Sequence, residues 1–125
     1  MNNGTTSLVH PEIRQIHSAT LEPPALPEDP YDCAITFQAL IGPRGGVGHE
    51  TFSFMVVTPV RLAKRPDGTW GRGMLIMPAF EWAAVAQSLA SLLSQAARPT
   101  WSEVIAELGR ELLLESAPAN DGQAH

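Results

Sequence analysis

Residues 33–57 read CAITFQALIGPRGGVGHETFSFMVV, and the strand pairing at the centre of the molecule follows from them. Apolar and polar side chains alternate over residues 33–41 and again over residues 51–56, the pattern of strands that bury one face. A glycine-rich loop, residues 42–48, lies between them and predicts a hairpin. This loop is longer than a two-residue turn, so it leaves the register of the two strands open.

The segments before this hairpin predict an edge strand and a stiff connector. Residues 12–21 carry scattered apolar positions, Ile13 and Ile16, and we expect a strand at the edge of the sheet. Residues 22–30 read EPPALPEDP. Four prolines in nine residues exclude a helix and a central strand, so we interpret this segment as an extended, acidic connector.

The segments after the hairpin predict a turn region, a short strand and two helices. Residues 61–72 contain Arg-Pro-Asp-Gly, which suits a tight turn, and residues 73–77 are an apolar strand that ends before Pro78. A first helix covers residues 82–97, and the capping box Thr-Trp-Ser-Glu at 100–103 starts a second, which we expect to continue past Gly109. The apolar positions at helical spacing are Trp82, Val85, Leu89, Leu92, Leu93 and Ala96, then Trp101, Val104, Ile105, Leu108 and Leu112.

Strands followed by helices predict an α+β fold. We expect an antiparallel sheet of three to four strands with two C-terminal helices packed on one face. The chain has 125 residues, the length of one domain. We place a single domain at residues 11–115, with flexible tails at residues 1–10 and 116–125.

Composition narrows the class of protein. Hydrophobic residues make up 44% and charged residues 17%, which excludes a highly charged disordered chain. With 13 acidic and 8 basic residues the net charge is -5, which disfavours nucleic acid and favours a basic partner. The single cysteine, the lack of a signal-like N-terminus and the absence of a long apolar stretch predict a cytoplasmic protein without a membrane partner.

No catalytic constellation stands out, and we expect no enzymatic activity, cofactor or metal. The glycine-rich loop lacks Gly-Lys-Ser/Thr and precedes a strand rather than a helix, so a hairpin loop is the better interpretation than a phosphate site. Cys33 sits on the apolar face of its strand, where packing is a better interpretation than nucleophilic attack with His17 or His49 as base. The histidines show no metal-ligand spacing.

The candidate contact residues lie in two acidic clusters and one basic loop. The acidic residues are Glu28, Asp29 and Asp32 around the connector, and Glu103, Glu107 and Glu111 (with Glu115) at intervals of four along the last helix. A solvated surface is the simple interpretation of both, and docking of a basic partner is the functional one. The basic loop, residues 61–72, combines Trp70 with Arg61, Lys64, Arg65 and Arg72. A solvated loop is its simple interpretation, and the functional ones are a protein contact by Trp70 and binding of single-stranded nucleic acid.

A set of short motifs recurs in order along the chain. They are Ile16-His17-Ser18, residues 41–45 with Gly48, Phe52-Ser53-Phe54, Val57-Thr58-Pro59, Leu62, Gly71-Arg72, Leu75-Ile76, Thr100-Trp101-Ser102-Glu103 and Leu108. Over about residues 12–114 their order and spacing resemble the immunity protein 8 family. The chain departs from the family at Val60-Arg61, where an aromatic residue often follows Thr-Pro, and at residues 112–116, which lack an aromatic and acidic ending.

The resemblance implies a small cytoplasmic protein that is made beside its toxin and neutralises the toxin domain of a polymorphic toxin or contact-dependent growth inhibition system. It implies a cognate toxin domain as partner, often a nuclease, and no catalytic residues. We therefore expect a binding protein that acts by stoichiometric occlusion. The alternatives are a housekeeping α+β binding module, dimeric through residues 82–97, and a small hydrolase that uses Cys33 or an acid pair.

Overall fold

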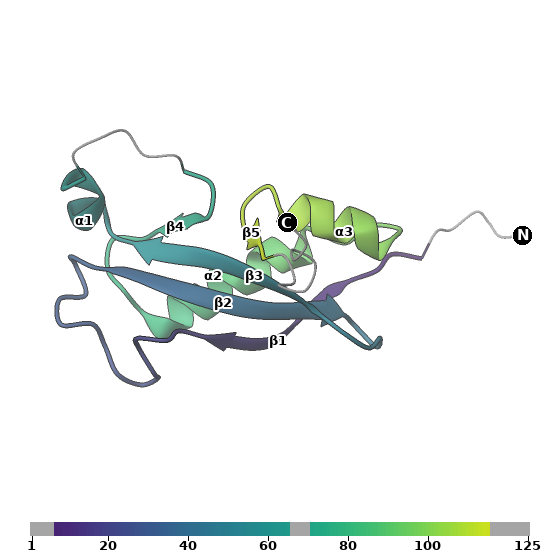
Figure 1. Ribbon diagram of the computed structural model, residues 1–125, viewed down its shortest axis with the longest axis horizontal. Coiled ribbons are helices and arrows are strands. Elements are labelled where there is room, and N and C mark those ends of the chain that lie inside the picture. The colour runs from purple at the N-terminus through teal and green to yellow at the C-terminus, as the bar shows by residue number, and fades with distance from the viewer. Residues whose placement is uncertain (1–6, 66–70, 116–125) are drawn as a thin grey trace, which may run out of the picture.

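The hairpin predicted from residues 33–57 is the centre of the sheet. A computed structural model describes residues 7–65 and 71–115, in which β2 (Ala34–Pro43) and β3 (Glu50–Val57) pair antiparallel with Phe37 opposite Phe54. β1 (Pro11–His17) pairs antiparallel with β2 at the edge of the sheet, as expected. Figure 1 shows the three strands side by side.

β4 (Met74–Ile76) pairs with β3 in parallel, and β5 (Leu113–Leu114) pairs antiparallel with an earlier part of β3. The fold is thus the predicted α+β class with a mostly antiparallel sheet, to which β5 is an unpredicted addition. β4 runs parallel because the chain returns along the sheet between the end of β3 and the start of β4, and a parallel pair needs such a crossover. Gly73 has a φ of 80°, and a Cβ on it would meet Leu113 at 2.9 Å, so this turn requires glycine.

A short helix, α1 (Pro59–Ala63), overlaps the start of residues 61–72, which the sequence predicted to be a turn region. The hydroxyl of Thr58 caps it by accepting from the amide of Arg61 at 3.4 Å, and Pro59 occupies its first turn. A threonine followed by proline is a signal for the start of a helix, and the sequence therefore contained this signal at Thr58-Pro59. The predicted tight turn at 65–68 lies largely outside the described residues.

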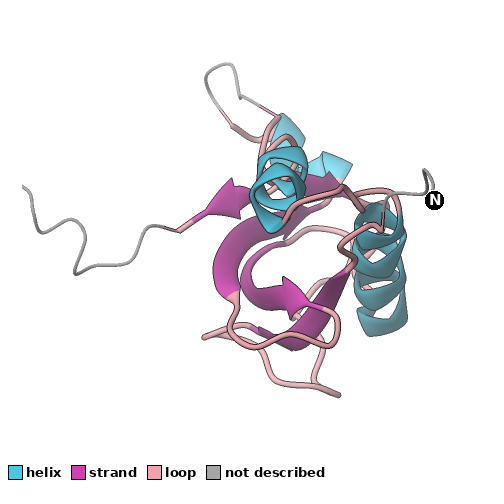
Figure 2. Cartoon of the chain, turned by 90° about the vertical axis from the view of Figure 1, so that its right-hand side faces the viewer, coloured by secondary structure: helices cyan, strands magenta, loops and turns pink. Residues whose placement is uncertain are grey.

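The two longer helices are α2 (Trp82–Ser94) and α3 (Trp101–Leu108). Figures 1 and 2 show α2 across the concave rear face of the sheet and α3 near the end where β5 joins it. The capping box of α3 is formed: Thr100 and Glu103 exchange two hydrogen bonds of 3.1 Å. The prediction that this helix continues past Gly109 is wrong, because the chain turns at residues 109–112 and returns to the sheet as β5.

Both helices and the inward face of β2 and β3 share one core. Phe37 is fully buried and stacks on Phe54 and Phe80 with ring centroids 5.5 and 6.1 Å apart, while the ring of Trp82 meets it edge-on at 5.7 Å. The apolar face of α2 is committed to this core: its buried residues are Val85, Leu89 and Leu93. Most of that face is therefore covered within the molecule.

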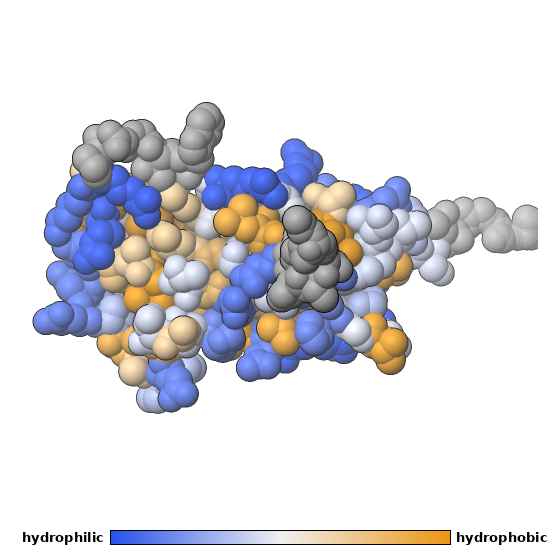
Figure 3. Space-filling model, viewed as in Figure 1, coloured by the Kyte–Doolittle hydropathy of each residue, from blue (hydrophilic) through white to orange (hydrophobic). Residues whose placement is uncertain are grey.

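Neither longer helix covers the other face of the sheet, which faces the viewer in Figure 1. On this face Figure 3 shows weakly polar and apolar side chains over the left half of the molecule, with hydrophilic side chains around them. Exposed apolar residues include Ile76, Leu113 and Leu114. No helix within the described part of the chain combines the length and the apolar character needed to cross a membrane.

Candidate protein-binding site

The three acidic residues predicted around the connector do come together. Glu28, Asp29 and Asp32 line one depression of about 660 Å³, open to solvent, and Arg61 from α1 lies at its side. Glu28 and Asp29 are exposed, and the carboxylate of Asp29 accepts from the amide of Tyr31 at 3.0 Å. The connector is held against the core because Trp82 Nε1 donates to the carbonyl of Ala25 at 2.6 Å.

Asp32, unlike Glu28 and Asp29, forms ion pairs that stabilise the fold. Its carboxylate accepts from Arg61 Nε at 2.8 Å and from the ammonium of Lys64, while the Arg61 guanidinium also donates to the Asp32 carbonyl at 3.0 Å. These hydrogen bonds, from Lys64 first and then from Arg61, hold the pKa of Asp32 below its ordinary value. The negative charge that this cluster offers a partner therefore resides on Glu28 and Asp29.

Cys33 lies beneath this depression as a packed thiol. Its side chain is buried and donates to the carbonyl of Pro30 at 3.6 Å. Burial raises the pKa of the thiol, so the neutral form prevails at neutral pH, the opposite of what a nucleophile requires. Neither His17 nor His49 is among the residues that line the depression. The packing interpretation agrees with this environment.

The second predicted cluster does not form a stripe along one helix. α3 ends at Leu108, so Glu111 lies in the following turn. Glu103 is occupied by the capping box, and Glu107 pairs with Arg98 at 3.1 Å and with Arg110 at 3.6 Å. Glu111 is exposed and has no ion pair with any described residue.

The residues of the predicted basic loop are spread over several contacts. Arg61 and Lys64 bind Asp32, the guanidinium of Arg65 lies 3.4 Å from the sulfur of Met55, and Arg72 donates to the carbonyl of Gly109 at 2.8 Å. Trp70, the predicted contact in this loop, lies outside the described residues.

A hollow lies on the uncovered face of the sheet. It measures about 320 Å³ and lies between the end of β1 and the middle of β2. Gln38 Nε2 donates to both carboxylate oxygens of Glu115 there, at 2.9 and 3.1 Å, which ties the end of β5 to β2. The residues of the hollow are His17, Ala19, Thr20, Ala34, Thr36, Gln38 and Glu115.

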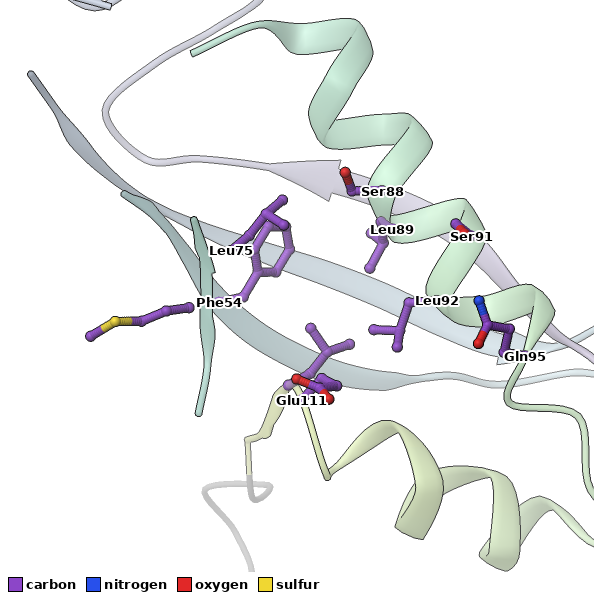
Figure 4. A pocket seen from close by; sticks show the side chains of 10 residues that line it. Phe54, Leu75, Ser88, Leu89, Ser91, Leu92, Gln95 and Glu111 are labelled. Carbon is purple, nitrogen blue, oxygen red and sulfur yellow. The ribbon is translucent and has the colours of Figure 1, made fainter. Parts of the chain in front are cut away.

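An apolar groove that was not predicted from the sequence runs between β4 and α2 (Figure 4). Its volume is about 290 Å³. The apolar lining residues are Phe54, Met74, Leu75, Leu89, Leu92 and Leu112, and the polar ones are Ser88, Ser91, Gln95 and Glu111. The sequence patterns predicted a strand and a helix at the two walls of the groove. The groove itself depends on the parallel pairing of β4 with β3, and no pattern within one element predicts that pairing.

The described residues contain no group of three or more histidine, cysteine, aspartate or glutamate side chains placed to hold a metal ion. The surface instead offers open depressions, a groove between sheet and helix, and exposed carboxylates. Open depressions and exposed carboxylates of this kind could each contact another macromolecule.

The model of one protein family, immunity protein 8, matches residues 12–115, and this chain belongs to that family. Membership implies a toxin as the partner and favours an inhibitor without enzymatic activity. Neither the curated proteins nor the solved structures contain a match.

Proposed function

We propose that this protein binds a cognate bacterial toxin domain in the cytoplasm and neutralises it by occlusion, as a one-to-one complex. The match to the immunity protein 8 family over residues 12–115 carries the proposal. In the proposed mechanism the protein covers a surface that the toxin needs and performs no chemistry of its own. The toxin belongs to a polymorphic or contact-dependent growth inhibition system, whose producer must protect itself.

A nuclease is the toxin class that the charge of this protein favours. Nucleases bind phosphate backbones through basic channels, because phosphate attraction supplies much of their affinity. A net charge of -5 is complementary to such a surface. Glu28 and Asp29 are the best candidates for this contact, since both are exposed and neither has an ion pair among the described residues. We keep Asp32, Glu103, Glu107 and Glu111 as outer members of the proposed surface, together with Trp70.

Titration of toxin activity tests both binding and stoichiometry. The toxin domain encoded beside this gene is expressed with and without the immunity protein, and growth is measured. Purified toxin is then titrated with purified immunity protein, and we expect residual activity to reach its minimum at one molar equivalent. Complete inhibition at far less than one equivalent would show turnover, and thus an enzyme. Unimpaired toxin activity at a large excess would contradict the proposal.

A further inference from the structure

The outer edge of β4 presents backbone groups that point away from the sheet. The amide of Met55 donates to the carbonyl of Gly73 at 2.8 Å, and the amide of Met77 donates to the carbonyl of Val57 at 3.2 Å. Backbone groups of a strand alternate between its two edges, so the N–H and C=O of Ile76 face outward. Within the described part of the chain, β4 pairs with β3 alone and no hydrogen bond reaches these two groups.

The apolar groove runs directly beside this edge. Figure 4 shows Phe54 and Leu75 on the strand side, Leu89 and Leu92 facing them from α2, and Glu111 at one end. At about 290 Å³ the groove lies at the lower limit of small-molecule pockets, which span roughly 300–1,000 Å³, and it suits one or two apolar side chains. An open strand edge next to a helix, with an apolar slot between them, is the geometry that binds extended peptides by adding a strand.

The rim of the groove carries one negative charge. Glu111 is exposed and has no ion pair with a described residue, whereas Ser88, Ser91 and Gln95 line the α2 side with neutral polar groups. A basic side chain of the bound peptide next to Glu111 would match this carboxylate and the net charge of -5.

We infer that the toxin contributes an extended segment that pairs with the outer edge of β4, seats an aliphatic or aromatic side chain between Leu75 and Leu92, and places a lysine or arginine beside Glu111. This inference rests on the proposed function and specifies the contact within it. Backbone hydrogen bonds to Ile76 supply affinity, and the groove and carboxylate supply specificity.

Replacement of the outward amide tests the strand pairing. Ile76→Pro removes this N–H at an edge position, where sheets accept proline, and Ile76→Ala removes the same apolar side chain but keeps the amide. Binding of each variant to the toxin domain encoded beside the gene is measured by calorimetry, with the unfolding temperature of each variant as a check. We expect the dissociation constant of Ile76→Pro to exceed that of Ile76→Ala about tenfold, as one lost hydrogen bond allows.

A measurement on the unaltered protein covers the case in which Ile76→Pro does not fold. Hydrogen exchange of the Ile76 amide is followed by NMR with and without the toxin domain, and we expect it to slow in the complex. For the groove, Ser91→Trp on its rim should weaken binding about tenfold by blocking entry of a side chain. Gln87→Trp, an exposed position of α2 outside the groove, is the matched control and should bind as the wild type does.

The outcomes separate this inference from the proposed function. If the wild-type protein does not bind the toxin domain, the proposed function is wrong. If it binds but the Ile76 amide exchanges at an unchanged rate and Ser91→Trp binds normally, the toxin docks elsewhere and only this inference is overturned.

Discussion

Asp32 lies in the predicted binding surface, but its carboxylate is occupied by hydrogen bonds that stabilise the fold. Three donors from Arg61 and Lys64 hold the carboxylate and carbonyl of Asp32, so this residue fastens α1 to the end of the connector. Its neighbours Glu28 and Asp29 have no comparable anchor among the described residues and remain open to a partner.

Removal of the Asp32 charge should destabilise the protein in a pH-dependent manner. The pKa of Asp32 is lowered in the folded state, so its contribution is present above the unfolded value of about 3.9 and is lost as pH falls through the folded value. Asp32→Asn should therefore have a lower melting temperature than the wild type at pH 7, and the two melting temperatures should converge as the pH falls below the unfolded value. Asp29→Asn is the control with little expected effect. A difference in melting temperature between the wild type and Asp32→Asn that stays constant with pH would contradict the ion-pair explanation.

Cys33 should be inert as long as the protein is folded. Burial covers the thiol and raises its pKa, and both effects reduce the thiolate that reacts with disulfide reagents. We expect a colorimetric thiol reagent to modify Cys33 at neutral pH only after denaturant is added. A folded Cys33→Ala protein should still inhibit the toxin. Loss of inhibition with an intact circular dichroism spectrum would restore a chemical role for this residue.

At the scale of the elements, α2 is the main cover of the sheet. Leu89 is 3% exposed and packs with the aromatic residues of β2 and β3 in one core. Leu89→Ala should lower the free energy of unfolding by about 2–5 kcal/mol, because it removes buried atoms and leaves a cavity. Urea denaturation measures this loss. The control Leu26→Ala lies at a 57% exposed position and should change stability by less than about 0.5 kcal/mol.

The elements that could be predicted are those whose signal is local. Alternation in residues 33–41 and 51–56 identified the central hairpin, and the capping box identified the first residue of α3. The end of α3 was not predictable in this way, because Leu112 continues the apolar spacing beyond Gly109. There the pairing of β5 with β3 outweighs helical periodicity, and this pairing connects residues 60 positions apart, such as Ser53 and Leu113.

At the scale of the whole molecule, the candidate site could likewise be predicted only where its residues are close together in the sequence. The connector cluster, which consists of Glu28, Asp29 and Asp32, could be predicted because these residues are close in the sequence, and the structure places them in one depression. The partners of these residues could not be predicted. Arg61 and Asp32 are 29 positions apart, and only the crossover through α1 brings them together. The groove between β4 and α2 was missed for the same reason, since no local pattern contains both of its walls.

Steering by the connector cluster and anchoring in the groove should act on different rate constants. Long-range attraction raises the association rate, whereas a buried anchor mainly slows dissociation. The double variant Glu28→Lys/Asp29→Lys should therefore associate with the toxin domain more slowly, by about tenfold at low salt, and should show a weaker dependence on salt. Its melting temperature should change little, because both side chains are exposed and neither has an ion pair among the described residues. Stopped-flow association rates at several salt concentrations measure the effect.

A control with the same net charge decides whether position or total charge is responsible. Glu22→Lys/Glu81→Lys also reverses two exposed carboxylates, and these residues do not line the connector depression. At physiological ionic strength the Debye length is about 8 Å, so local charges should dominate and this control should associate faster than Glu28→Lys/Asp29→Lys. Equal rates for the two double variants would mean that only total charge matters. A third outcome is an association rate that is insensitive to salt and to both double variants. Apolar contacts, such as those in the groove beside β4, would then determine the association rate as well as the dissociation rate.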